Sequence, residues 1–130
     1  MLNLTLDEQT EISNMIISLL NGWGVSSTDQ VTILAMPENI RPRAMRRYES
    51  LPFPDEPQIW ERVEHLAGIA DALRTMYPLY PQMSAIWMNK ANNRFKNRTP
   101  LVSMLEDGLD GIIAVRAHLD CTFDWEVNGS

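Results

Sequence analysis

The chain has 130 residues, of which 45% are hydrophobic and 22% are charged. This composition excludes a disordered chain and fits one domain, or two small ones that share a core. No apolar run is long enough to span a membrane, and the N-terminus lacks the basic start and apolar core of a signal peptide. A single cysteine, Cys121, cannot form an internal disulfide, so we expect a cytoplasmic protein.

The segment 1–50 carries the start and stop signals of three helices. Thr5 and Glu8 fit a capping box ahead of a wide apolar face, and Ser26 fits the N-cap of a second helix. Pro37 ends that second helix. The helices are expected over about residues 6–22, 27–35 and 42–50. Two short helices joined by a turn, the later one basic at its start, have the outline of a helix-turn-helix domain.

A local basic patch stands out against the net charge of −6, which by itself argues against general nucleic-acid binding. The basic residues before Pro57 are Arg41, Arg43, Arg46 and Arg47. Arginines at the start of a recognition helix can reach phosphates or base edges, so these four are candidate DNA-binding residues. The alternative is a solvated face, or pairing with acids of the first helix. The turn also lacks the usual glycine and has Ala35-Met36-Pro37 instead.

A proline-rich segment, residues 51–57, is expected to be an extended linker between two domains, with Phe53 pinning it to a surface. A long helix follows from Gln58 to Tyr77, with an apolar seam that fits a core or a homodimer. Three shorter helices are expected after it: one near residues 81–90, one that begins at Thr99, and a last one that ends near Asp120. We assign residues 58–121 to a second helical domain and residues 122–130 to a tail without helical period. No alternating strand pattern occurs, so the expected fold is all-α.

The stretch from Trp87 to Leu101 is unusual in composition. Its asparagines favour turns over helix interiors, and Phe95 is expected to be buried within the loop. Thr99 can cap the next helix, with Pro100 at its first position. Four basic side chains are expected to form the solvated rim of this loop: Lys90, Arg94, Lys96 and Arg98.

Catalytic and metal-binding patterns are missing from the sequence. His65, His118 and Cys121 do not stand at the spacing of a nucleophile with its base, and they form no metal-ligand motif. No glycine-rich phosphate loop occurs. We therefore expect neither catalytic residues nor a cofactor or metal, and we expect a binding protein. The aromatic residues of the tail favour a partner interface, because aromatic side chains are common interface anchors. The alternative is that both rings fold back onto the same domain.

The stretch from Trp87 to Leu101 resembles part of the toxin-binding domain of the Xre/MbcA/ParS antitoxin family. The resemblance as a whole covers roughly residues 58–121. The residues that carry the resemblance are Trp87, Asn92, Phe95, Thr99, Pro100, Leu101, Leu105, Gly108, Val115 and Leu119. In this family a helix-turn-helix-like domain commonly precedes the toxin-binding domain. The sequence departs from the family pattern at Ala91, where proline is frequent, and at Asn97, where glycine is common.

The resemblance implies a type II antitoxin that blocks the active site of a RES-domain toxin, an NAD⁺-consuming protein. It also implies a homodimer that represses its own operon by binding operator DNA. The toxin-binding residues would be Arg116, Leu119, Phe123, Asp124 and Trp125, with Phe123 and Trp125 as anchors. The rival interpretations are a stand-alone helix-turn-helix regulator with a C-terminal dimerisation domain, and an adaptor that never binds DNA.

Overall fold

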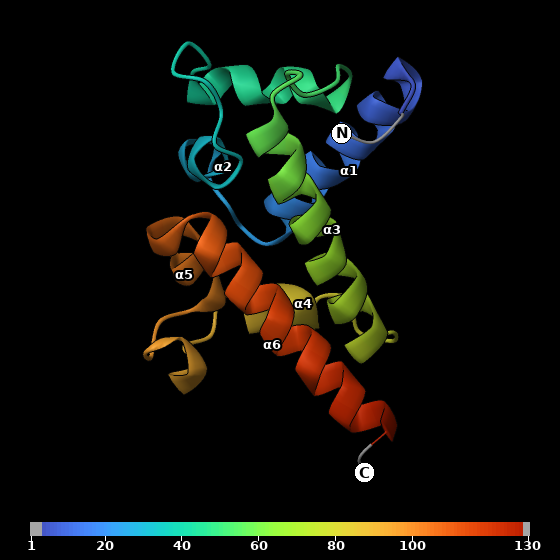
Figure 1. The fold of residues 1–130 in the computed structure, drawn as a ribbon, viewed down its shortest axis with the longest axis vertical. Coiled ribbons are helices and arrows are strands. Elements are labelled where there is room, and N and C mark those ends of the chain that lie inside the picture. Colours follow the sequence, from blue (N-terminus) through green and yellow to red (C-terminus); the bar gives the residue numbers. More distant parts are fainter. Residues whose placement is uncertain (1–3, 129–130) are drawn as a thin grey trace. The chain divides into compact units, whose positions relative to one another are not determined.

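The computed structural model describes residues 4–128, and the side chains of residues 4–121. Within that part of the chain every regular element is helical, apart from one isolated β-bridge, which confirms the all-α prediction (Figure 1). In chain order the elements are α1 (Leu6–Gly22), α2 (Ser27–Ile33), η1 (Pro42–Glu49), α3 (Pro57–Met76), α4 (Met83–Met88), η2 (Asn93–Phe95), α5 (Pro100–Asp107) and α6 (Leu109–Asn128). None of the described helices has the length and apolar character needed to cross a membrane.

The chain divides into two compact units, Met1–Glu64 and His65–Ser130, and the division falls within α3. The predicted linker segment belongs to the first unit. Its Phe53 is buried, with ring centroids 5.2 Å from Tyr48 and 6.1 Å from Trp60. The Phe53 N–H donates to Ser13 Oγ at 2.8 Å. These contacts confirm that Phe53 pins the segment.

The helix starts of the first unit follow their predicted caps. Thr5 Oγ1 accepts the Glu8 N–H at 3.1 Å, and the Glu8 carboxylate accepts the Thr5 N–H at 3.0 Å. Ser26 Oγ accepts the Asp29 N–H at 3.2 Å at the start of α2. Hydrogen bonds of this kind form within one short segment and need no tertiary partner, which is why they could be predicted from the sequence.

The ends of α1 and α2 share one hydrogen-bond pattern, the Schellman motif. In each, the N–H two residues beyond the C-cap returns to the carbonyl five positions earlier, at 2.9 Å in α1 and 3.1 Å in α2. The residue after the C-cap is left-handed in both motifs: Gly24 with φ 81° and Ala35 with φ 53°. Glycine takes this conformation without cost, whereas alanine carries strain there. Ala35 therefore makes the turn that sequence patterns assign to glycine.

The third predicted helix is present over Pro42–Glu49, but it is a 3₁₀-helix. With three residues per turn, Met45 and Tyr48 lie in one column along the helix, and both are buried. α1 and α2 both pack against η1. At the end of η1, Asn14 Nδ2 donates to the Glu49 carbonyl at 2.8 Å and ties it to α1.

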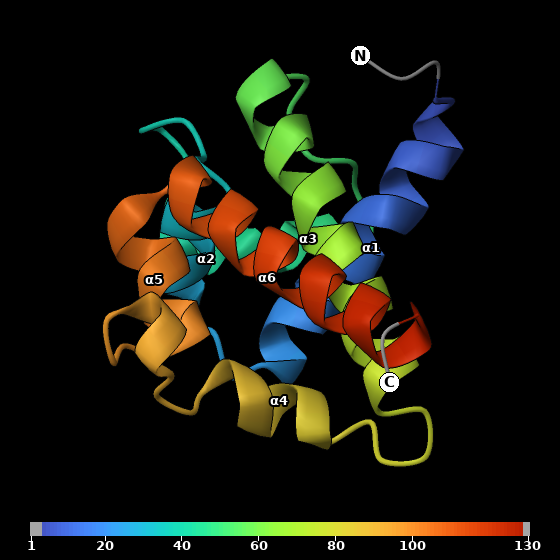
Figure 2. The same cartoon turned by 60° about the horizontal axis from the view of Figure 1, so that its bottom comes forward.

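In the second unit α5 and α6 pack side by side, with α4 next to α5 (Figure 2). Gly108 is the single residue between α5 and α6, with φ 64° and ψ −138°. That conformation is open to glycine and very costly for other residues. Three residues later, a β-carbon on Gly111 would lie 2.2 Å from the Ser103 carbonyl oxygen. Glycine at these two positions allows the chain to reverse and the helices to touch.

The predicted end of the last helix near Asp120 is wrong, because α6 continues to Asn128. The sequence pattern failed there because no apolar period marks residues 121–128. Those residues contain neither proline nor glycine, and adding residues to an existing helix is far easier than nucleating one. The predicted tail is therefore largely a continuation of α6.

Candidate functional site

The loop over residues 92–98 is closed by Asn92 at its base. The Asn92 N–H donates to the Arg98 carbonyl at 3.0 Å, and the Asn92 carbonyl accepts the Phe95 N–H at 3.0 Å. The Asn92 side-chain oxygen accepts the Arg94 N–H at 2.9 Å. Asn92 thus supplies a backbone donor, a backbone acceptor and a side-chain acceptor to the turn, which explains the asparagine in the motif.

Three rings of the second unit converge beside this loop. Phe95 is buried and lies edge-on to Trp87 and to His118, with centroids 6.4 Å and 5.5 Å away. Trp87 and His118 are nearly parallel, at 12°, with centroids 6.3 Å apart. The prediction that Phe95 is buried within the loop is confirmed. His118 brings α6 into the same cluster.

His118 has a pKa below the ordinary value for histidine. Partial burial is the main cause, since it penalises the charged imidazolium, and the nearby Arg94 charge adds to it. The imidazole is therefore kept neutral at pH 7, in keeping with its position against two aromatic rings.

Arg98 ties the loop to the end of α5. Its Nη2 lies 2.8 Å from Asp107 Oδ2, its Nη1 lies 3.0 Å from Glu106 Oε1, and its Nε donates to the Phe95 carbonyl at 3.0 Å. The Arg98 guanidinium holds the pKa of Asp107 below its ordinary value. Two carboxylates from α5 therefore pair with Arg98, whose side chain remains 23% exposed.

The other motif residues also have structural roles. Thr99 caps α5, with its Oγ1 accepting the Val102 N–H at 3.0 Å, and Pro100 is the first residue of that helix. Gly108 supplies the reversal into α6. These residues of the resemblance thus set the start of α5 and the turn from α5 into α6.

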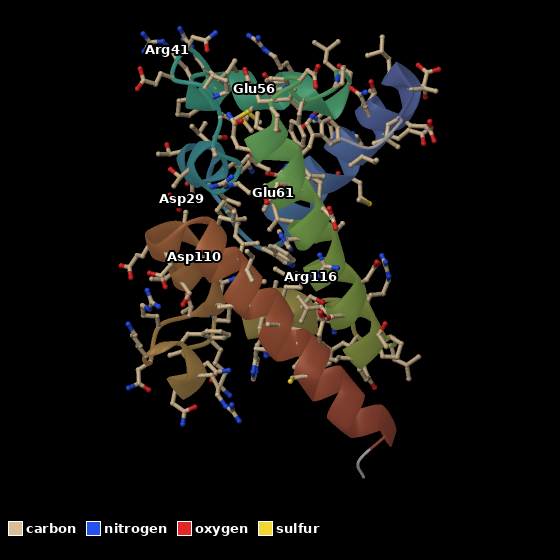
Figure 3. The ribbon with its side chains drawn as sticks, viewed as in Figure 1. Asp29, Arg41, Glu56, Glu61, Asp110 and Arg116 are labelled. Carbon is tan, nitrogen blue, oxygen red and sulfur yellow. The ribbon has the colours of Figure 1, made fainter. Side chains whose placement is uncertain are left out.

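Arg116 makes contacts within the second unit. Figure 3 shows its side chain on α6, directed towards α3, where a β-carbon on Gly68 would lie 2.6 Å from its Cζ atom. Its Nη1 lies 3.2 Å from His65 Nδ1 and its Nε 3.9 Å from Asp120 Oδ2. The Arg116 side chain is 31% exposed.

The remaining predicted toxin-binding residues occupy different environments. Leu119 is fully buried, at 0% exposure, among the apolar residues of α6. Phe123, Asp124 and Trp125 lie on the last turns of α6, and their side chains lie outside the described residues. The structure therefore does not bring the five residues to one described surface.

The predicted DNA-binding residues lie on η1 and on the turn before it. Arg41, Arg43, Arg46 and Arg47 are all exposed, and none of their guanidinium groups pairs with a described residue. Figure 3 shows Arg41 on the outer side of that turn. The alternative that they pair with acids of the first helix finds no contact among the described residues.

The sequence did not predict that His118 joins the cluster of Phe95 and Trp87. Its spacing gave a usable signal, since His118 stands three residues after Val115 and one before Leu119, both of which are buried. Helical spacing therefore puts it at the border of the apolar face.

Among the side chains that the structure describes, no three potential ligands gather into a site for a metal ion. Comparisons with known protein families, curated proteins and solved structures find no match to this chain. The fold itself defines the class: an all-α protein of two helical units.

Proposed function

We propose that this chain is the antitoxin of a type II toxin–antitoxin pair, which binds a RES-domain toxin and blocks its NAD⁺-consuming active site. The observation that carries the proposal is the packing of the Phe95, Trp87 and His118 rings beside a loop that Asn92 closes. In this arrangement the motif residues of the resemblance have mutually consistent structural roles. These residues hold the helix α6, which extends to Asn128.

The C-terminal turns of α6 are the proposed toxin-binding element. Phe123 and Trp125 would anchor it, and Asp124 would offer a carboxylate to cationic groups in a pocket that accepts an anionic dinucleotide. Because Leu119 is fully buried, its proposed role is to hold α6 in place beneath the contact surface. Arg116 keeps enough exposure to contribute a charge at the border of that surface.

The proposal predicts that a RES-domain toxin is encoded beside this chain, and co-expression with that toxin tests it. Cells should grow when both are present, and deleting residues 122–130 should abolish protection. Phe123→Ala with Trp125→Ala should weaken toxin binding by at least about 10-fold, since anchor residues each contribute roughly 1–2 kcal/mol or more. Leu79→Ala with Tyr80→Ala is the matched control, because these side chains are 81% and 60% exposed on another segment.

Two outcomes would contradict the proposal. Cells that die whether or not this chain is present would remove the toxin as a partner. Unchanged protection by the chain lacking residues 122–130 would remove the end of α6 from the site, and would favour an adaptor or a stand-alone regulator.

A second proposed role is binding of operator DNA by η1, with a homodimer as the binding species. The observation in its favour is the set of four exposed arginines on a chain with net charge −6. The guanidinium groups of these arginines pair with no described residue. A mobility-shift titration with the chain's own upstream DNA tests this role. Absence of any complex at low salt would count against it.

A further inference from the structure

Three exposed basic residues lie in the loop over residues 92–98 or just before it: Lys90, Arg94 and Lys96. We call them the loop cations. None of the three forms an ion pair with a described residue, whereas Arg98 in the same loop is held by two carboxylates of α5. The charge of Arg98 is thus used within the fold, and the charges of the loop cations remain available to a partner.

The backbone that carries the loop cations is fixed in place. Phe95 at the centre of the loop is buried, and the Asn92 N–H closes the loop by donating to the Arg98 carbonyl at 3.0 Å. The charge of Arg94 helps to lower the pKa of His118, so these two side chains lie close together. A surface that is ordered before binding loses less entropy when it meets a partner. The loop cations are therefore presented beside α6 on an ordered loop.

His118 connects the loop cations to the proposed toxin-binding end of α6. Positions 118, 122 and 125 are four and three residues apart, so they follow one side of this α-helix. An α-helix rises about 1.5 Å per residue, which places position 125 about 10 Å along α6 from His118. A standard interface buries about 800 Å² on each partner, a patch roughly 30 Å across. A partner of ordinary size on the end of α6 therefore covers the loop cations as well.

The two ends of this surface carry opposite charge. The last turns of α6 hold three acidic residues and no lysine or arginine: Asp120, Asp124 and Glu126. Under the proposed function, these turns meet a pocket that is cationic because it accepts an anionic dinucleotide. The loop cations, about two helical turns away, require the opposite charge on the partner. Charges of both signs on one surface fix the orientation in which a partner docks.

We infer that Lys90, Arg94 and Lys96 bind an acidic patch on the toxin, beside the pocket that receives the end of α6. A nucleic acid fits this surface less well, because its phosphates carry one sign of charge and the acidic end of α6 repels them. The inference rests on the proposed function and extends the toxin-binding surface to the loop. Exposed charges at the edge of an interface act mainly on the association rate, so that rate is where the loop cations should be visible.

Stopped-flow mixing of the full chain with the RES-domain toxin, at about 50 and about 200 mM salt, tests the inference. Lys90→Gln with Arg94→Gln and Lys96→Gln should slow association by about 10-fold at the lower salt and flatten its dependence on salt. The dissociation rate should change by less than about threefold. The matched control keeps every charge in place: Lys90→Arg with Arg94→Lys and Lys96→Arg should associate like the unchanged chain. Both variants should unfold at the same urea concentration as that chain, because all three side chains are exposed.

Three results would overturn the inference. Equal association rates for the glutamine and the charge-retaining variants would show that the charges are not used, and an equal loss in both would show that charge is not the cause. Weaker binding of duplex DNA by the glutamine variant, with toxin association unchanged, would assign the loop cations to nucleic acid. An unchanged chain that binds no RES-domain toxin would remove the proposed function and the inference together, whereas toxin binding that ignores the loop variants would remove the inference alone.

Discussion

Gly68 on α3 and Arg116 on α6 lie so close that a β-carbon on Gly68 would stand 2.6 Å from both Cζ and Nε of the arginine. At this position the Arg116 Nη1 atom lies 3.2 Å from His65 Nδ1. Arginine can only donate hydrogen bonds, so His65 Nδ1 must accept and its proton must reside on Nε2. A missing side chain on one helix thus sets both the place of an arginine and the tautomer of a histidine.

Gly68→Ala should displace Arg116 from His65 while changing stability little. The arginine is flexible and can move aside, and alanine is favoured over glycine within a helix by about 1 kcal/mol. We expect the free energy of unfolding to change by less than about 1 kcal/mol, and the Nδ1 chemical shift of His65 to change clearly. A loss of stability well above that range would show that Arg116 cannot yield.

Gly111→Ala should be far more damaging, because the new β-carbon would lie 2.2 Å from the Ser103 carbonyl oxygen, which belongs to the backbone of α5. Relief requires α5 and α6 to separate, so we expect a loss of about 2–3 kcal/mol or more in urea unfolding. Gly22→Ala is the control, since a β-carbon at that position would meet no atom within 4 Å. It should be neutral or slightly stabilising, and an equal loss at both positions would contradict the close-contact explanation.

Ala35→Gly should stabilise the chain by about 0.5–1 kcal/mol, because relief of left-handed strain exceeds the entropy that glycine adds to the unfolded state. The Schellman motif at the end of α1 offers the reverse experiment. Gly24→Ala should cost about 1 kcal/mol, since it places a β-carbon on a residue with φ 81°. Thermal and urea unfolding measure both changes. Opposite signs are required, and a destabilising Ala35→Gly would refute the strain.

His118 should make stability depend on pH. Its folded-state pKa is lowered from 6.5, so the unfolded chain takes up a proton first as the pH falls. Stability should therefore be highest above about pH 6.5 and should fall as the pH drops towards the folded-state value. His118→Phe keeps a ring in the cluster and removes the titration, so its melting temperature should fall less between pH 7.5 and 5.5. An identical decline in both proteins would contradict this assignment, and NMR titration of the imidazole gives the pKa directly.

Local sequence signals predicted the helix starts well. Thr5, Ser26 and Thr99 all cap helices as expected, because a capping side chain bonds an N–H only two or three residues away. The same signals missed the type of η1 and the length of α6. The composition of Pro42–Glu49 is compatible with either helix type. In the folded chain Met45 and Tyr48, three residues apart, are both buried, and α1 and α2 pack against η1.

An all-α chain, the position of most helices and the closed loop around Phe95 could be predicted from the sequence, since each follows from hydrogen bonds and spacing within a short segment. The roles of the charged and aromatic side chains depended on tertiary packing. Arg98 pairs with Asp107 from the end of α5, and His118 joins Trp87 across the second unit. Hydrogen-bonded ion pairs and ring contacts form only between side chains a few ångströms apart, and sequence spacing does not reveal which distant side chains come that close.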